Sequence, residues 1–150
     1  MITKSITVAE ISISYKPAIA NKPIITTAID AYNVLLQFFS EDTIQLQEQF
    51  VAMYLNRSNR VLGCYKLSNG GITGTVADLR LILGTALKTA ATGIIIGHNH
   101  PSGNLVPSQV DIQLTKKILE ASKMMDIILY DHLILCTDGK YMSFADEGLI

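Results

Sequence analysis

The chain has 150 residues, a length that suits one domain with a core of its own. Hydrophobic residues make up 49% of it and charged residues 17%, a balance that excludes a disordered binding chain. Its formal net charge of -1 gives no overall attraction to phosphate backbones, so a role with nucleic acid would have to rest on a local patch.

The cysteines and the apolar stretches bear on where the protein works. Cys64 and Cys136 form neither a disulfide framework nor a CxxC metal pair, which favours two buried thiols in a reducing compartment. Residues 1–9 lack the continuous apolar stretch of a signal peptide. The longest segment without Asp, Glu, Lys or Arg covers residues 89–110, but its apolar part, residues 90–97, is far shorter than the ~20 residues of a membrane span. We therefore expect a cytoplasmic protein that does not enter the membrane.

The first predicted elements are an extended segment and a helix. Apolar and polar side chains alternate within residues 6–15, as is typical of a strand. Two prolines then bracket a linker that includes residues 18–22. Thr27 and Asp30, three residues apart, form the capping-box pattern that opens a helix.

A hairpin and a second helix follow. Residues 50–55 and 61–67 are rich in strand-forming side chains and are separated by a short turn, so they predict an antiparallel hairpin. Thr75 and Asp78 repeat the capping-box pattern, and apolar residues at helical spacing continue to about Thr89.

The last third of the chain predicts a buried strand, a loop, a helix and two more strands. The segment 93–97 is short, rich in β-branched side chains and flanked by glycine, which predicts a buried strand. A polar loop over residues 98–107 comes next. Ser108 and Asp111 open a helix that ends near Met125. The two remaining strands are expected at residues 127–136 and 141–144. The alternation of helices and strands indicates an α/β domain with a mixed sheet.

Two of the three histidines stand in the predicted loop. His98 and His100 are two residues apart on extended backbone, so their side chains point the same way and can reach one ion. The carboxylate of Asp111, in the first turn of the next helix, can turn back to complete a three-ligand set with a fourth position for water, as in catalytic zinc sites. The alternatives are a solvated or hydrogen-bonded histidine pair, and a helix cap formed by Ser108 and Asp111.

The loop also carries a resemblance to a known family. The HxHP segment followed by Ser-x-x-Asp resembles the JAMM motif of the JAB/MPN metalloprotease superfamily. The longer string HNHPSG, with DHLIL and the ending SFADEGLI, resembles the RadC branch of that superfamily over residues 27–150. The resemblance implies one JAB/MPN-like α/β domain, a curved mixed sheet flanked by helices in an architecture like that of cytidine deaminases. Residues 1–26 would be an N-terminal extension.

The resemblance also implies a site and a reaction. His98, His100 and Asp111 would hold Zn²⁺. Glu48 matches the glutamate that precedes a strand in the family motif and would be the general base, a choice that the polar segment holding both Glu41 and Glu48 leaves open on its own. Ser108 would donate to the oxyanion. The substrate would be a peptide or protein, cut at a peptide or isopeptide amide.

Two other functions stay open at this point. One is a non-catalytic MPN-like interaction module, and the other is an accessory factor in DNA repair or processing, as the family name suggests. The near-zero charge and the lack of a helix-hairpin-helix segment weaken the role with DNA. The family's Pro-Arg-Glu element reads VADLR at residues 76–80. The N-terminal strand offers pairing within the chain or across a homodimer.

Asp131 and His132 also match the RadC pattern. Adjacent residues of a strand face opposite sides, so without a bulge the two cannot both point into one site. His132 is predicted to be a hydrogen-bonded core or interface histidine that shares a face with Ile128, Tyr130, Ile134 and Cys136. Asp131 is the candidate for an outer contact of the site.

Overall fold

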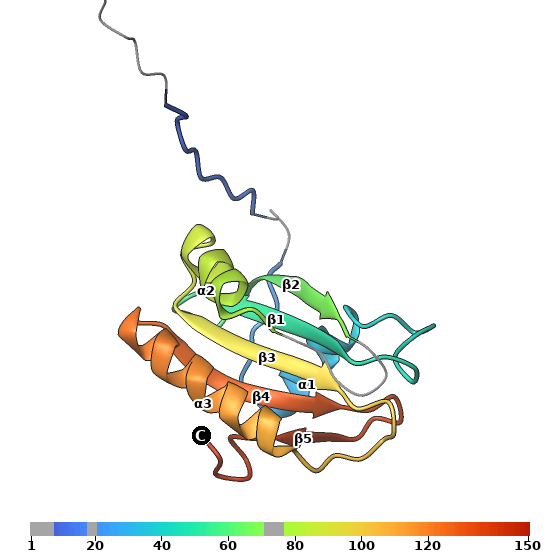
Figure 1. The fold of residues 1–150 in the computed structure, drawn as a ribbon. Helices are drawn as coiled ribbons and strands as arrows, with labels where there is room; N and C mark the ends of the chain where they lie inside the picture. Colours follow the sequence, from blue (N-terminus) through green and yellow to red (C-terminus); the bar gives the residue numbers. More distant parts are fainter. Residues whose placement is uncertain (1–7, 18–20, 71–76) are drawn as a thin grey trace, which may run out of the picture.

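The computed structural model describes residues 8–17, 21–70 and 77–150. A five-stranded sheet with strand order β2-β1-β3-β4-β5 forms its centre, with helices on both faces (Figure 1). The elements in chain order are α1 (Ala28–Leu36), β1 (Gln49–Leu55), β2 (Val61–Asn69), α2 (Leu79–Lys88), β3 (Gly93–Asn99), α3 (Gln109–Met124), β4 (Ile128–Leu135) and β5 (Tyr141–Ser143).

The sheet is mixed, as predicted. β1 pairs antiparallel with both β2 and β3, β3 pairs parallel with β4, and β4 pairs antiparallel with β5. The hairpin of β1 and β2 is therefore confirmed. Since β3 and β4 run parallel, the chain between them must cross over, and α3 makes that crossover.

Each face of the sheet has its own core. Helix α1 covers one face, and α2 and α3 cover the other (Figure 1). The seven residues of β1 are all buried, as are the seven of β3, because both strands are central and covered on both sides. The largest fully buried side chains of the α1 core include Leu35, Met53, Leu55 and Leu133, and those of the other core include Phe50, Tyr54, Ile82 and Ile118.

Two of the three predicted capping boxes are present. The carboxylate of Asp30 accepts hydrogen bonds from the backbone and hydroxyl of Thr27, each at 2.9 Å, at the start of α1. The box of Ser108 and Asp111 opens α3. The predicted start of α2 is wrong: Asp78 is its N-cap and accepts from the backbone N–H of Arg80, so the helix begins later than a cap at Thr75 would give. Thr75 itself lies outside the described residues.

Strand β3 is longer than the sequence predicts. It continues through His98 to Asn99, so the polar loop begins at His100 and not at His98. The glycines of this strand leave room for its neighbours, because a Cβ on Gly93 would overlap the ring of Tyr130. Because β3 extends through Asn99, His98 lies within the central strand of the sheet.

Gly97→Ala is expected to lower the free energy of unfolding by about 1–3 kcal/mol, the usual cost of overpacking a core. Its Cβ would lie 2.9 Å from Cδ1 of Leu135 and 3.0 Å from Cδ1 of Leu35. Urea denaturation followed by circular dichroism measures the change. Gly63→Ala in β2 is the matched control, since its Cβ would meet nothing within 4 Å. Equal losses in the two variants would contradict the packing argument.

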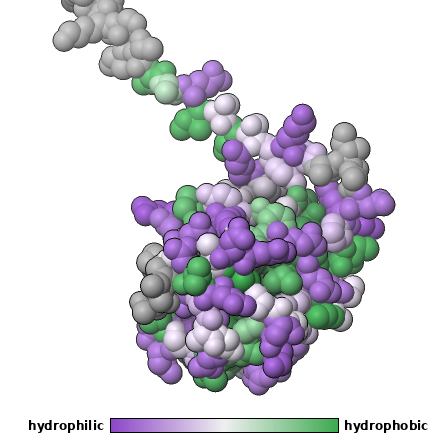
Figure 2. Space-filling view, turned by 90° about the vertical axis from the view of Figure 1, so that its right-hand side faces the viewer, coloured by the Kyte–Doolittle hydropathy of each residue, from purple (hydrophilic) through white to green (hydrophobic). Residues whose placement is uncertain are grey.

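The N-terminal segment differs from the prediction. Residues 8–17 form no strand, although an extended strand was expected over residues 6–15, whose first two residues lie outside the described part. Ile11 and Ile13 are 88% and 74% exposed, and Figure 2 shows this segment standing off the folded body. The Tyr15 hydroxyl donates to the carbonyl of Leu62 at 2.6 Å and ties the segment to β2.

The predicted linker between Pro17 and Pro23 is described only in part. Residues 18–20 of the linker lie outside the described residues, and Ile24 makes an isolated antiparallel bridge to Arg60. Among the described residues, no helix has the length and apolar character needed to cross a membrane.

Candidate metal centre

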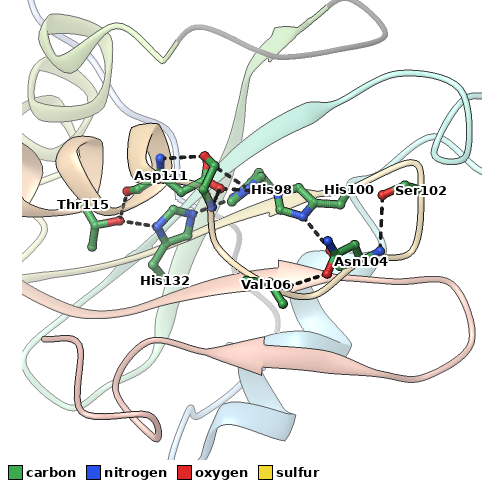
Figure 3. A network of polar contacts seen from close by, with 9 residues as sticks. His98, His100, Ser102, Asn104, Val106, Asp111, Thr115 and His132 are labelled. Carbon is green, nitrogen blue, oxygen red and sulfur yellow. Dashed lines mark hydrogen bonds and ion pairs between the residues drawn. The ribbon is translucent and has the colours of Figure 1, made fainter.

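The three predicted ligands meet at the C-terminal end of the central strand β3. His98 is the penultimate residue of β3, His100 follows the strand, and Asp111 lies in the first turn of α3 (Figure 3). Nε2 of His98 lies 3.3 Å from Oδ1 of Asp111, and Nε2 of His100 lies 3.4 Å from Oδ2. The two Nε2 atoms are 2.9 Å apart. The crossover from β3 to α3 thus brings together residues that are up to 13 positions apart in the chain.

These distances fit a small divalent cation. Ligand atoms at the corners of a tetrahedron, each about 2.0–2.1 Å from a zinc ion, lie about 3.3 Å from one another. The two nitrogen–oxygen distances match that spacing, and the nitrogen–nitrogen distance is somewhat shorter. Two bare imidazole nitrogens 2.9 Å apart would repel, so a proton or a cation must lie between them. The donor set therefore suits Zn²⁺.

His100 is oriented by the loop that follows β3. Its Nδ1 donates to the backbone carbonyl of Asn104 at 2.6 Å, which turns Nε2 toward Asp111. A carbonyl can only accept, so the direction of this hydrogen bond is certain. The hydrogen bond with Asp111 raises the pKa of His100, against burial, which lowers it.

The helix cap holds Asp111 in place. Its Oδ2 accepts from the backbone N–H of Ser108 at 2.7 Å, and its own N–H donates to the Ser108 hydroxyl at 3.1 Å. Burial raises the pKa of the Asp111 carboxyl, but contacts with His100 and His98 outweigh burial, and the net pKa lies well below its usual range. The carboxylate is therefore ionised, as a metal ligand must be. The predicted helix cap and the ligand cluster are thus both present and share Asp111.

Ser108 is exposed at the start of α3. Its hydroxyl oxygen accepts from the backbone of Asp111, so its own proton remains available to another acceptor. This places a hydroxyl donor beside the cluster, as the proposed oxyanion role requires.

Glu48 comes next to the cluster through the pairing of β1 with β3. Phe50 lies opposite His98 in this antiparallel pair, so Glu48, two residues before Phe50, and His100, two residues after His98, extend from neighbouring ends of the two strands. The charge of Glu48 contributes to the raised pKa of His100, so the two side chains are near enough to interact.

Asn99, which the sequence reasoning did not single out, holds the backbone on both sides of Glu48. Its Oδ1 accepts from the backbone N–H of Gln49 at 2.6 Å, and its Nδ2 donates to the carbonyl of Gln47 at 2.9 Å. Asn99 is buried and lies between the two histidine ligands in sequence. The position of this amide residue between two motif histidines is the sequence signal that could have identified it.

His132, predicted as a core histidine, and Thr115, which the sequence analysis missed, both contact the ligand candidates. His132 is fully buried, and its Nε2 lies 2.7 Å from Nδ1 of His98. Its Nδ1 lies 2.7 Å from the hydroxyl of Thr115, which in turn donates to the backbone carbonyl of Asp111 at 2.6 Å (Figure 3). Burial lowers the pKa of His132 well below its usual range. The expectation of a hydrogen-bonded core histidine is confirmed, and its partner is a ligand candidate.

A β-bulge decides which way His132 points. The pairing of β3 with β4 skips Tyr130, and this extra residue shifts the alternation of side chains along β4. His132 therefore lies with buried Leu129 on the α3 face, and its expected shared face with Tyr130 is wrong. Asp131 points to the opposite face, among residues of α1 and the C-terminal turn.

Asp131→Ala is expected to lower the free energy of unfolding by about 2–3 kcal/mol, the usual cost of buried donors left unpaired. The Asp131 carboxylate accepts from the backbone of His132 and Ala145 and from the hydroxyl of Ser143, which joins β4 to the C-terminal turn. Zinc affinity should stay unchanged, because Asp131 contacts His132 only at its backbone and contacts none of the ligand candidates. Chemical denaturation and a zinc titration measure the two effects, and a large loss of zinc affinity in the folded variant would contradict this assignment.

An open pocket of about 240 Å³ borders the cluster at His100. The loop after β3 forms one wall, and the end of β4 with its following turn forms the other. Its polar lining residues include Gln45, Ser102, Thr137 and Asp138. Of the three ligand candidates, His100 alone lines this pocket.

The fold and the cluster together define a class of protein. A mixed sheet with helices on both faces, with a His–His–Asp cluster where its parallel strands end, is the arrangement of a JAB/MPN-type domain. A family model described as RadC-like JAB domain matches residues 25–149. The chain belongs to the RadC-like JAB domain family.

Relatives within this family are longer than the chain. A UPF0758 protein of Flavobacterium johnsoniae is 46% identical over 125 residues, which cover 83% of this chain and 53% of that protein. A UPF0758 protein of Porphyromonas gingivalis is 42% identical over 126 residues, covering 84% and 54%. The UPF0758 protein tlr1707 of Thermosynechococcus vestitus is 39% identical over 132 residues, covering 87% and 52%. The chain spans about half the length of these curated relatives.

Proposed function

We propose that the protein is a zinc-dependent hydrolase of the JAMM type that cleaves a peptide or isopeptide amide. The observation that carries this proposal is the cluster of two imidazole nitrogens and a carboxylate at distances that suit a tetrahedral zinc site. Three protein ligands leave one position open, as catalytic zinc sites do. The two free cysteines fit work in the reducing cytoplasm.

The site residues divide into metal ligands and groups that accept or donate a proton. His98, His100 and Asp111 would hold Zn²⁺, which when bound lowers the pKa of water to about 7 and so supplies a nucleophile near neutral pH. Glu48 accepts the proton of the attacking water and delivers it to the leaving amine. Ser108 donates its free hydroxyl proton to the oxyanion that develops on the substrate carbonyl.

The pocket beside His100 supports a peptide-like substrate. It is open, and it is lined by both apolar and polar side chains, including Ile44, Leu135, Ser102 and Thr137. Such a surface suits one or two residues of a chain on one side of the scissile amide better than it suits a large folded group.

Metal analysis of the purified chain tests the proposal. The protein is stripped with a chelator, dialysed, and titrated with Zn²⁺ in competition with a chromophoric chelator. We expect one tightly bound equivalent, and hydrolysis of at least one member of a panel of fluorogenic peptide and isopeptide substrates that depends on this equivalent. Failure to bind zinc would overturn the proposal. Binding without turnover across the panel would favour the non-catalytic module instead.

A further inference from the structure

The geometry points to Thr115 and His132 as positioning residues that set the tautomer of His98 and so present its Nε2 to a divalent cation. The inference rests on the proposed zinc site. Three hydrogen bonds link the backbone carbonyl of Asp111, the hydroxyl of Thr115, and the rings of His132 and His98 in one chain (Figure 3). This series of hydrogen bonds begins at the ligand candidate Asp111 and ends at the ligand candidate His98.

The first hydrogen bond of the series decides which group donates and which accepts in the others. The hydroxyl oxygen of Thr115 lies 2.6 Å from the carbonyl oxygen of Asp111, one turn earlier in α3. Two oxygens at that distance would repel without a proton between them, and a carbonyl has none to give. The single hydroxyl proton of Thr115 therefore points to Asp111.

The next bond must then run toward Thr115. With its proton committed, the hydroxyl can only accept from Nδ1 of His132, 2.7 Å away. His132 is fully buried between the rings of Phe50 and Phe144, with ring centroids 5.8 and 4.6 Å away. Such surroundings disfavour a charged imidazolium, so the ring carries one proton, on Nδ1.

The last hydrogen bond makes the tautomer of His98 depend on that of His132. Nε2 of His132 has no proton, so it accepts from Nδ1 of His98 at 2.7 Å. With Nδ1 of His98 donating to His132, Nε2 is the ring nitrogen left to face Asp111 and His100. The ring nitrogen that a metal binds is set by the hydrogen bond that the other nitrogen makes.

The two histidine ligands differ in how this choice is made. His100 donates from Nδ1 to the carbonyl of Asn104, which cannot reverse the bond. His98 faces another histidine, which can donate or accept, so its tautomer depends on Thr115. Without the Thr115 hydroxyl, His132 is free to carry its proton on Nε2. His98 would then hold its own proton on Nε2 and block the ligand atom.

Thr115→Val tests the inference, because valine keeps the shape of threonine and removes the hydroxyl. We expect zinc affinity to fall by about 10–100-fold, the usual effect of losing an outer partner of a metal ligand. Thr115→Ser should restore it, since serine keeps the hydroxyl. Ser122→Ala is the matched control: Ser122 is buried in the same helix, and its hydroxyl has no partner among the described residues.

Ring-nitrogen NMR gives a readout that does not need zinc. Long-range ¹H–¹⁵N spectra of the metal-free chain should show His132 with its proton on Nδ1 and a bare Nε2, and in Thr115→Val this tautomer should be lost or mixed. An Nε2 proton on His132 in the unmodified chain overturns the inference, whether or not the chain binds zinc. Equal zinc affinity in Thr115→Val and Ser122→Ala overturns it too, while leaving the zinc site intact. Failure of the unmodified chain to bind zinc overturns the proposed function alone.

Discussion

Asp111→Asn is expected to reduce zinc affinity by at least about 100-fold, more than the loss of an outer partner does. The substitution removes the only carboxylate of the cluster formed by the described residues. An asparagine oxygen can still accept from the backbone N–H of Ser108, so the cap of α3 remains. Competition with a chromophoric chelator measures the affinity, and circular dichroism verifies the helix.

The matched control removes the cap and keeps the ligand. Ser108→Ala loses the hydroxyl that accepts from the Asp111 N–H, which costs about 1 kcal/mol of stability. The carboxylate and both histidines stay, so zinc affinity should remain near that of the unmodified chain. Comparable zinc binding by Asp111→Asn and the unmodified chain would remove Asp111 from the ligand set.

Glu48→Gln is expected to keep zinc affinity and to reduce hydrolysis by about 10²–10⁴-fold, the range for loss of a general base. The amide has nearly the same shape and cannot take a proton from water. Asn99 bonds to the backbone on either side of Glu48, so the substitution leaves that segment in place. Initial rates on the best substrate of the panel, at saturating zinc, measure the loss.

Glu41→Gln is the matched control for this variant. Glu41 lies in the same polar segment and is exposed, and it lines a pocket with Leu36 and Phe39 that includes none of the ligand candidates. Its replacement should leave both zinc binding and hydrolysis unchanged. Turnover by Glu48→Gln at the rate of Glu41→Gln would take Glu48 out of the base role.

The elements of this fold could be predicted where local signals are strong. The caps at Thr27 and Ser108 are short-range patterns, and the structure places helices directly after both. The prediction failed where a local pattern has two alignments, as at Asp78, which fits both a third helical residue and an N-cap. It also failed for the segment that includes Ile11 and Ile13, because alternation alone provides no partner strand.

The candidate site divides in the same way. The His98–His100 pair and its spacing to Asp111 could be predicted from local sequence, because side chains two apart on extended backbone share a face and a helix cap fixes its third residue. Only the fold brings the charge of Glu48 near His100, since that depends on the pairing of β1 with β3.

The structure likewise decided that His132 turns toward His98. One extra residue at Tyr130 reverses the alternation of β4, and the parallel pairing with β3 then sets His132 beside the ligand. A bulge depends on the packing of the neighbouring strand, and the local sequence contains no such information. The ligand pattern was therefore determined by the sequence, whereas the surrounding side chains that orient the ligands were decided by the assembly of the sheet.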